Sequence, residues 1–292
     1  GYCCFRTPVQ AGCLMAPATV EQTLKSGAAL GCTEALFTFG ERPEEEPGFS
    51  ALIRAAGYTT ILDYCEAMCK KSIEYGILPH TNAGILSFHE LERFRKVNAS
   101  MGLMLETTAQ VPAHRGSKGK EPEIRIAMIE DAGKLMIPFT TGLLLGIGET
   151  MADRKDSLLA ICDIHRRYRH IQEVIIQNFC PKPGTPMAEH PVPTTAELCA
   201  TIRMAREILP EDIAIQIPPN LIDASILLAC GVDDLGGVSP LTIDYVNPEH
   251  PWPAVEELRN LVGARELRER LCIYPQYIEK GWYDPGLEPL IN

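Results

Sequence analysis

Apolar and polar positions along the chain form a repeating unit. Each unit has a short apolar run, a polar or glycine-rich end, and then an amphipathic stretch. Short apolar runs bounded by turn residues are typical of buried strands. They predict strands over 34–40, 77–86, 101–105, 139–148, 173–179, 213–217 and 232–235.

A side-chain cap begins most of the predicted helices. A Ser or Thr followed three residues later by an acidic residue or Gln has the spacing of a capping box. This spacing occurs at Thr19/Gln22, Ser87/Glu90, Thr150/Asp153 and Thr194/Glu197. Further helices are predicted over 49–75, 124–135 and 221–229.

Strands that alternate with crossover helices indicate a parallel sheet. Seven such units fit an α/β (β/α)8 barrel of the TIM type in which the first strand is missing. A doubly wound open sheet is the competitor, but the glycine-rich dinucleotide fingerprint expected after its first strand is absent. We predict a barrel over residues 1–240 and a C-terminal extension, 241–292, packed on it.

The composition of the chain argues against nucleic acids and membranes as partners. The chain has 27 basic and 38 acidic residues, a formal net charge of −11, which argues against a nucleic-acid groove. No apolar run approaches the roughly 20 residues of a membrane helix, and no leader is visible, so no membrane partner is expected. The 11 cysteines, an odd number in a chain too large to need a disulfide framework, favour a reducing cytoplasm.

Polar residues and glycines follow the predicted strands. In a (β/α)8 barrel the active site lies at the carboxyl ends of the strands. A single residue there is more often a helix cap or a turn residue, whereas the set converges on one end of the barrel. Its members are Gly40, Glu41, His80, Asn82, Glu106, Gly146 to Glu149, Gln177, Asn178, Asn220, Asp233 and Asp234.

Two long loops belong to the same end of the predicted barrel. Loop 110–123 carries His114, Arg115, Lys118 and Lys120, and either grips a carboxylate or a sugar hydroxyl or is a solvated basic loop. Loop 181–193 contains five prolines, which stiffen it as a wall of a pocket.

Several strings together resemble one enzyme family. Tyr2-Cys3 is similar to the end of the C-x3-C-x-aromatic-C loop of radical S-adenosylmethionine (SAM) enzymes, and GERPE at 40–44 is similar to their GExPE motif. HTNAGIL (80–86), VNASMGLMLE (97–106), HRGS (114–117), IPFTTG (137–142), GIGET (146–150), QEVIIQNF (172–179), KPGTPM (182–187) and DYVNPE (244–249) complete the set. The chain thus resembles subunit 1, the CofG type, of the 7,8-didemethyl-8-hydroxy-5-deazariboflavin (FO) synthases, truncated at its N-terminus.

The resemblance implies a radical SAM carbon–nitrogen lyase. A 4Fe-4S cluster reduces SAM, which gives methionine and a 5′-deoxyadenosyl radical. The radical takes a hydrogen atom from 5-amino-5-(4-hydroxybenzyl)-6-(D-ribitylimino)-5,6-dihydrouracil, the tyrosine-derived adduct. Ring closure with loss of ammonia then yields FO, the precursor of a deazaflavin coenzyme.

Residue roles carry over from the matching motifs. Cys3 is expected to be the third cluster ligand, with two more cysteines upstream of Gly1, so this chain alone is expected to lack the cluster and to be inactive. Cys4 is expected to be a bystander. The expected SAM-binding residues are Tyr2, Gly40, Glu41, Glu106, Gly146, Gly148 and Glu149.

The remaining assignments rest on position. From their places at strand ends, His80, Asn82, Arg115 and Asn178 are expected on the substrate side. Cys65 and Cys69 copy the C-x3-C spacing, but they lie in a predicted helix, which cannot wrap thiolates around a cluster, so we expect them to pack in the core.

The resemblance also implies partners and leaves alternatives. The expected partners are the adduct, the companion subunit that makes it, and an electron donor of the flavodoxin or ferredoxin type. One alternative is that the chain is itself the companion radical SAM subunit, although HTNAGIL and KPGTP favour the first assignment. The other is a non-catalytic barrel that binds a small anion.

Overall fold

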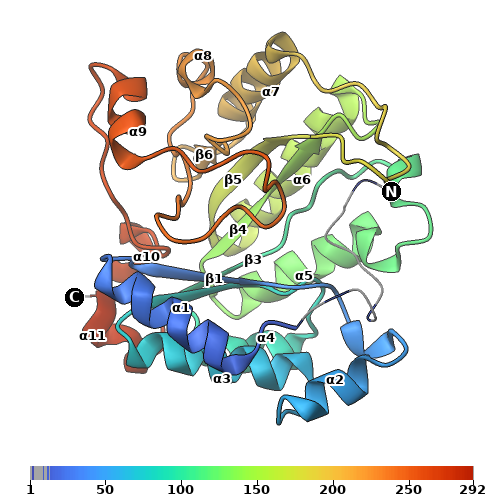
Figure 1. Cartoon of the computed structure of the whole chain (residues 1–292). Coiled ribbons are helices and arrows are strands. Elements are labelled where there is room, and N and C mark those ends of the chain that lie inside the picture. Colours follow the sequence, from blue (N-terminus) through green and yellow to red (C-terminus); the bar gives the residue numbers. More distant parts are fainter. Residues whose placement is uncertain (1, 3–8, 10–11, 13, 292) are drawn as a thin grey trace. The chain divides into compact units, whose positions relative to one another are not determined.

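The computed structural model describes residues 2, 9, 12 and 14–291 of the chain (Figure 1). Its elements group into two compact units, each built from two parts of the sequence. Unit 1 comprises Gly1–Cys4 and Leu103–Glu269, and unit 2 comprises Phe5–Gly102 and Arg270–Asn292. In both units neighbouring strands are parallel, as the alternation of strands and helices predicts.

Unit 2 contains a three-stranded parallel sheet. Strand β2 (Leu78–Asn82) pairs with β1 (Glu34–Thr38) and with β3 (Ser100–Gly102). The connections carry the short helix α2 (Phe49–Ala55), then α3 (Ile61–Glu74), and α4 (Phe88–Phe94). Helix α1 (Pro17–Ala29) packs against α3 (Figure 1). These are the predicted strand–helix–strand crossovers.

Two predictions for the helices of unit 2 are wrong. Helix α1 begins at Pro17 and not at Thr19, because proline is favoured in the first turn of a helix, where its missing N–H is not needed. The predicted helix 49–75 is two helices. Gly57, at φ 90°, breaks the first, and Thr60 caps the second by accepting a hydrogen bond from the Asp63 N–H at 3.1 Å.

The end of the chain packs in unit 2. Helix α10 (Pro275–Glu279), the 3-10 turn η5 (Pro285–Leu287) and α11 (Glu288–Ile291) follow one another there. Tyr277, Ile273 and Leu287 are fully buried and form one apolar cluster with Leu78 and Ala99. This cluster packs the C-terminal segment against the start of β2 and the residue that precedes β3.

Unit 1 contains a second parallel sheet. Strand β5 (Ile171–Asn178) pairs with β4 (Phe139–Leu145) and with β6 (Ala214–Gln216). Every residue of β4 is buried, as expected of a parallel strand covered on both faces. The helices are α5 (Pro122–Lys134), α6 (Met151–Tyr168), α7 (Thr195–Ile208), α8 (Ala224–Leu228) and α9 (Val255–Val262).

The last predicted strand, 232–235, is not formed. A single bridge joins Asp234 to Gln216, and a regular ladder does not continue from it. The Asp234 carboxylate instead accepts a hydrogen bond from the Gly236 N–H at 2.6 Å, and Gly236 takes φ 69°, so the chain turns away at this point. Within the described residues, no helix has the length and apolarity needed to cross a bilayer.

Gly142 on β4 lies where the packing leaves no room for a side chain. A Cβ at Gly142 would lie 2.7 Å from Met104 Cε, 2.9 Å from Ile175 Cβ and closer still to the Ile175 carbonyl oxygen. That oxygen belongs to the neighbouring strand and cannot move without disturbing the ladder. Replacing Gly142 by alanine is therefore expected to lower the free energy of unfolding by about 1–3 kcal/mol, measured by urea denaturation.

The control for this substitution is Gly27, inside α1, where a Cβ would have its nearest neighbours at 3.6 Å. Alanine there is expected to raise stability by about 0.5–1 kcal/mol, because glycine is unfavourable in a helix interior. A G142A variant that unfolds at the wild-type urea concentration would contradict the packing described here.

Candidate active site

Glu106 lies at the centre of the candidate site in unit 1. Its backbone N–H donates to the Gly142 carbonyl at 2.8 Å, and it forms a bridge with Leu143, which places it against β4. Its φ is 67°, in a region that residues other than glycine rarely adopt. Such a conformation persists where the surrounding structure fixes it, and it directs the buried side chain of Glu106 into a set of polar partners.

Four side chains surround the Glu106 carboxylate. The Tyr2 hydroxyl group donates a hydrogen bond to Glu106 Oε2, and His114 Nε2 lies 2.9 Å from the same oxygen. The Lys120 ammonium group pairs with the other oxygen, Oε1, and Arg125 Nη1 lies 3.6 Å from it. Both oxygens are thus occupied by groups of the protein itself.

This arrangement determines the charge of Glu106. Burial alone raises the pKa of a carboxyl group, but the hydrogen bond from His114 and the positive charges of Lys120 and Arg125 outweigh it. The pKa of Glu106 is consequently held well below its usual range. The site therefore contains a carboxylate that is ionised and fixed in position at neutral pH.

An apolar wall lies beside this polar cluster. Val111, Ala113, Leu144, Ile147 and Phe179 form a buried apolar group, and Tyr2 and Met187 pack against it. The Tyr2 ring meets the Phe179 ring edge-on, with centroids 6.5 Å apart. The polar cluster around Glu106 is thus joined through the Tyr2 ring to a buried apolar group.

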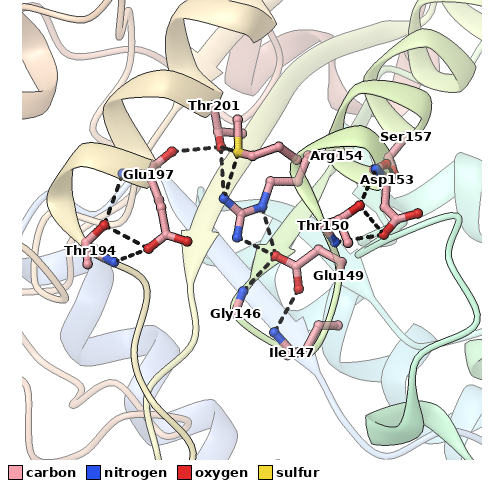
Figure 2. A network of polar contacts seen from close by, with 11 residues as sticks. Gly146, Ile147, Glu149, Thr150, Asp153, Arg154, Ser157, Thr194, Glu197 and Thr201 are labelled. Atoms are coloured by element: carbon pink, nitrogen blue, oxygen red, sulfur yellow. Dashed lines mark hydrogen bonds and ion pairs between the residues drawn. The ribbon is translucent and has the colours of Figure 1, made fainter.

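The loop 146–149 at the carboxyl end of β4 is shaped by Glu149 (Figure 2). Its carboxylate accepts hydrogen bonds at 2.8 Å from the N–H groups of Gly146 and Ile147. Arg154 donates to the same carboxylate from Nε at 2.9 Å and forms an ion pair with it at 2.8 Å. The loop is thus held from inside, and its glycines take φ values of 92° at Gly146 and 110° at Gly148.

A second polar group follows the carboxyl end of β5. Asn178 is buried and donates from Nδ2 to Cys180 Sγ at 3.5 Å. Lys182 is also buried, and its ammonium group pairs with Glu249. Lys182 and Glu249 were not singled out from the sequence, although the KPGTPM and DYVNPE strings contain them.

In unit 2 the side chains of the GERPE motif contact residues of the following segments. Gly40 and Glu41 are exposed, and a Cβ at Gly84 would lie 2.9 Å from Glu41 Cβ. Arg42 pairs with Glu90 through two hydrogen bonds of 2.7 Å. The segment after β1 thus lies against Gly84 of the HTNAGIL segment, which takes φ 69°, and is tied to α4 through Glu90.

Two predicted substrate residues lie on β2. His80 is buried, and its Nδ1 lies 2.6 Å from Ser100 Oγ, which donates to the Cys272 carbonyl. Burial, with a contribution from the charge of Arg270, lowers the pKa of His80 to about 4. His80 is therefore neutral at pH 7. Asn82 is half-buried and pairs in register with Thr38 of β1.

The structure brings some predicted residues together and separates others. Tyr2 and Glu106 are in direct contact, and Gly146, Gly148 and Glu149 share one loop. Arg115 is exposed, while its neighbour His114 points to Glu106. The basic loop 110–123 thus binds an internal carboxylate through His114 and Lys120.

The predicted metal ligand cannot be placed. Cys3 lies outside the described residues. Within the described part of the chain, no group of three or more His, Cys, Asp or Glu side chains is arranged to hold a metal ion. Cys65 and Cys69 are buried in α3, and Cys69 Sγ lies 3.6 Å from Thr81 Oγ1, so the expected core role of this pair is confirmed.

Comparison with known structures concerns the fold. The FeFe-hydrogenase maturase HydG from Carboxydothermus hydrogenoformans superposes with a TM-score of 0.66 at 16% identity, over 99% of this chain and 76% of that one. Methylornithine synthase, PylB, gives a TM-score of 0.60 at 16% identity, over 94% of this chain and 76% of that one. The likeness confirms the predicted (β/α) barrel type of fold.

Comparison with known sequences concerns the family. No protein-family profile matches the chain. Proteins named 7,8-didemethyl-8-hydroxy-5-deazariboflavin synthase match it throughout: that of Methanoregula boonei is 70% identical over 292 residues, which are 100% of this chain and 89% of that protein. That of Archaeoglobus fulgidus is 53% identical over 294 residues, 100% of this chain and 90% of that protein. The chain therefore belongs to the family of 7,8-didemethyl-8-hydroxy-5-deazariboflavin synthases, which are radical SAM enzymes of deazaflavin biosynthesis.

Proposed function

We propose that the chain carries out the lyase step of this pathway. In that step the tyrosine-derived adduct, 5-amino-5-(4-hydroxybenzyl)-6-(D-ribitylimino)-5,6-dihydrouracil, becomes FO with loss of ammonia. The observation that carries the proposal is the identity of 70% over the whole chain with a relative named for this product. The companion subunit that forms the adduct, and a flavodoxin- or ferredoxin-type electron donor, are the proposed partners.

The proposed cofactors are a 4Fe-4S cluster and SAM. When bound, they supply a 5′-deoxyadenosyl radical through one-electron cleavage of SAM. The residues of unit 1 suit such a cosubstrate, because Glu106 is a carboxylate fixed in position and Gly148 is an exposed residue of loop 146–149 without a side chain. A Cβ at Gly148 would have its nearest neighbour 3.8 Å away, at Pro112.

Roles for individual residues complete the proposal. Cys3, with two cysteines further upstream, holds the cluster. Gly40 and Glu41 bind the methionine end of SAM, and Tyr2, Glu106, Gly146, Gly148 and Glu149 border its ribose and adenine. His80, Asn82, Arg115 and Asn178 lie on the substrate side. The apolar wall of Val111, Leu144, Ile147 and Phe179 keeps water from the reacting groups.

The test uses the protein expressed from its complete gene and reconstituted anaerobically with iron and sulfide. We expect iron–sulfur absorption, 5′-deoxyadenosine from SAM, and deazaflavin fluorescence when the purified adduct is supplied. Replacing Cys3 by alanine is expected to abolish all three signals, because three thiolates are needed for the cluster. The matched control, Cys4→Ala, is expected to retain them.

Other outcomes separate the alternatives. Absence of both the absorption and 5′-deoxyadenosine would end the radical SAM assignment and favour a barrel that binds a small anion. Formation of 5′-deoxyadenosine with tyrosine and the ribitylaminouracil, but no fluorescence from the adduct, would identify the chain as the companion subunit. Loss of the cluster in the C4A variant would overturn the assignment of Cys3 as the ligand of this pair.

A further inference from the structure

Lys182 carries a buried positive charge just beyond the carboxyl end of β5 in unit 1. Its side chain is 7% exposed, and its ammonium group pairs with the Glu249 carboxylate, whose side chain is 48% exposed. An ammonium group has three N–H donors and a carboxylate has two acceptor oxygens, so a single ion pair leaves both groups able to form further hydrogen bonds. The pair is neutral as a whole and is accessible from its Glu249 side.

Two further polar groups of β5 and its loop lie beside this ion pair. Asn178, the last residue of β5, is buried and donates to Cys180 Sγ at 3.5 Å. Burial raises the pKa of the Cys180 thiol, the charge of Lys182 opposes this rise, and the charge of Glu249 adds to it, as neighbouring charges do. The Asn178 amide is therefore separated from the ion pair by little more than the Cys180 side chain.

The turn that precedes Glu249 is held in place by Asp244. The Asp244 carboxylate accepts hydrogen bonds from the backbone N–H groups of Val246 at 2.9 Å and Asn247 at 3.0 Å. It also accepts from the side-chain amides of Asn220 at 3.0 Å and Asn247 at 3.1 Å. Asn220 follows β6, so these bonds tie the turn to the sheet. Glu249 thus extends from a fixed backbone, which lowers the cost of ordering it on a ligand.

The ion pair lies to one side of the loop proposed to border SAM. Loop 146–149 follows β4, whereas Lys182 follows β5, and Asn220, which anchors the turn before Glu249, follows β6. Strand β5 lies between β4 and β6, and neighbouring strands are ~4.8 Å apart. A substrate whose reacting carbon faces SAM at the end of β4 therefore extends its unreactive part toward the ends of β5 and β6.

We infer that the Lys182–Glu249 pair binds the ribityl chain of the adduct, which is a neutral polyol. Each hydroxyl group of such a chain can accept a hydrogen bond from the Lys182 ammonium group and donate one to the Glu249 carboxylate. The chain passes unchanged into FO, so it suits a site without net charge at a distance from the reacting atoms. This inference rests on the proposed function, since it takes the adduct to be the substrate, and it agrees with the place proposed for Asn178.

The experiment measures the binding of FO, which keeps the ribityl chain, by fluorescence anisotropy with the reconstituted, full-length protein and SAM. The comparison ligand is the analogue of FO that has a methyl group in place of the ribityl chain. The wild type is expected to bind FO more tightly than the analogue, because polar groups placed for hydroxyl groups are left unpaired without them.

Two substitutions are expected to remove this preference. Lys182→Met and Glu249→Gln are each expected to weaken the binding of FO roughly 10- to 100-fold, the effect of losing a hydrogen bond to a charged group. Both variants are expected to bind the methyl analogue as the wild type does, which also shows that they are folded. The matched control is Glu189→Gln, at an exposed position of loop 181–193, which is expected to bind both ligands like the wild type.

The outcomes separate this inference from the proposed function. Equal binding of FO and the analogue by the wild type, or unchanged binding of FO by the Lys182 and Glu249 variants, would overturn the inference. An equal loss for both ligands would also overturn it, and would make the pair a structural link between loop 181–193 and the turn before Glu249. A reconstituted wild type that binds neither ligand would instead contradict the proposed function.

Discussion

Replacing Arg154 by methionine is expected to lower the free energy of unfolding by about 3–5 kcal/mol, because it leaves the Glu149 carboxylate buried without its cation. The Arg154 and Glu149 side chains are 4% and 1% exposed. Chemical denaturation followed by circular dichroism measures the change. The loss is large because a buried charge keeps its full desolvation cost when its partner is removed.

Arg154 also connects elements of unit 1. Its guanidinium group reaches Thr201 Oγ1 of α7 at 3.4 Å, besides its bonds to Glu149 (Figure 2). The loop 146–149 depends on the same carboxylate, so the R154M variant is expected to raise the KM for SAM as well, if this loop borders SAM as proposed. Arg154→Lys keeps the charge but cannot form the paired contact, and an intermediate loss of stability is expected.

The matched control lies on the same helix. Arg166 forms an ion pair with Asp163 in which the two side chains are 64% and 67% exposed. Arg166→Met is expected to change the free energy of unfolding by less than about 0.5 kcal/mol, as exposed pairs contribute little. Equal denaturation midpoints for R154M and R166M would show that the buried pair does not stabilise the fold.

Local signals in the sequence predict the elements well where their physical cause is also local. The capping boxes at Ser87, Thr150 and Thr194 are all formed, since each needs only residues three apart. The prediction fails at Thr19, where Pro17 starts the helix earlier, and at the bridge of Asp234, where pairing depends on a distant strand. Whether a short apolar run forms a strand depends on the neighbouring strand with which it can pair.

In the candidate site, too, features with a local cause can be predicted from the sequence and those that depend on distant residues cannot. The glycines and Glu149 of loop 146–149 can be recognised as a motif, but the pairing of Glu149 with Arg154 depends on the first turn of the helix that follows. The partners of Glu106 are further away in the sequence, at Tyr2, His114 and Lys120. Only the folded path of loop 110–123 shows that its cations meet a carboxylate of the same chain. The sequence alone cannot distinguish a loop that binds a ligand from one that binds a carboxylate of its own chain.

Lowering the pH from 7 to 5 is expected to destabilise both units through histidines that are buried in the neutral form. Burial, opposed by the hydrogen bond that His170 donates to the Ile129 carbonyl, lowers the pKa of His170 from 6.5 to about 3, and burial lowers that of His80 from 6.5 to about 4. The folded pKa lies below the unfolded one in both cases, so the unfolded chain binds more protons between these values. Stability is complete above pH 6.5 and is lost as the pH falls.

The size of the effect follows from proton linkage. Between pH 7 and pH 5 each histidine is expected to remove about 2 kcal/mol from the free energy of unfolding. The pKa values of the paired carboxylates Glu106 and Glu90 are lowered from 4.5. Their protonation therefore reduces the free energy of unfolding mainly at more acidic pH. Urea denaturation at several pH values between 7 and 5 therefore isolates the histidines.

Two substitutions and a control assign the effect to these residues. His80→Asn retains a polar group near Ser100 Oγ, and His170→Gln retains a donor for the Ile129 carbonyl, which lies 2.9 Å from His170 Nε2. Each is expected to flatten the pH dependence of the unit that contains it. His89, whose side chain is 91% exposed, supplies the control, and His89→Gln is expected to leave the dependence unchanged. If all three variants lost stability with acid as steeply as the wild type, protonation of the buried histidines would not be the cause.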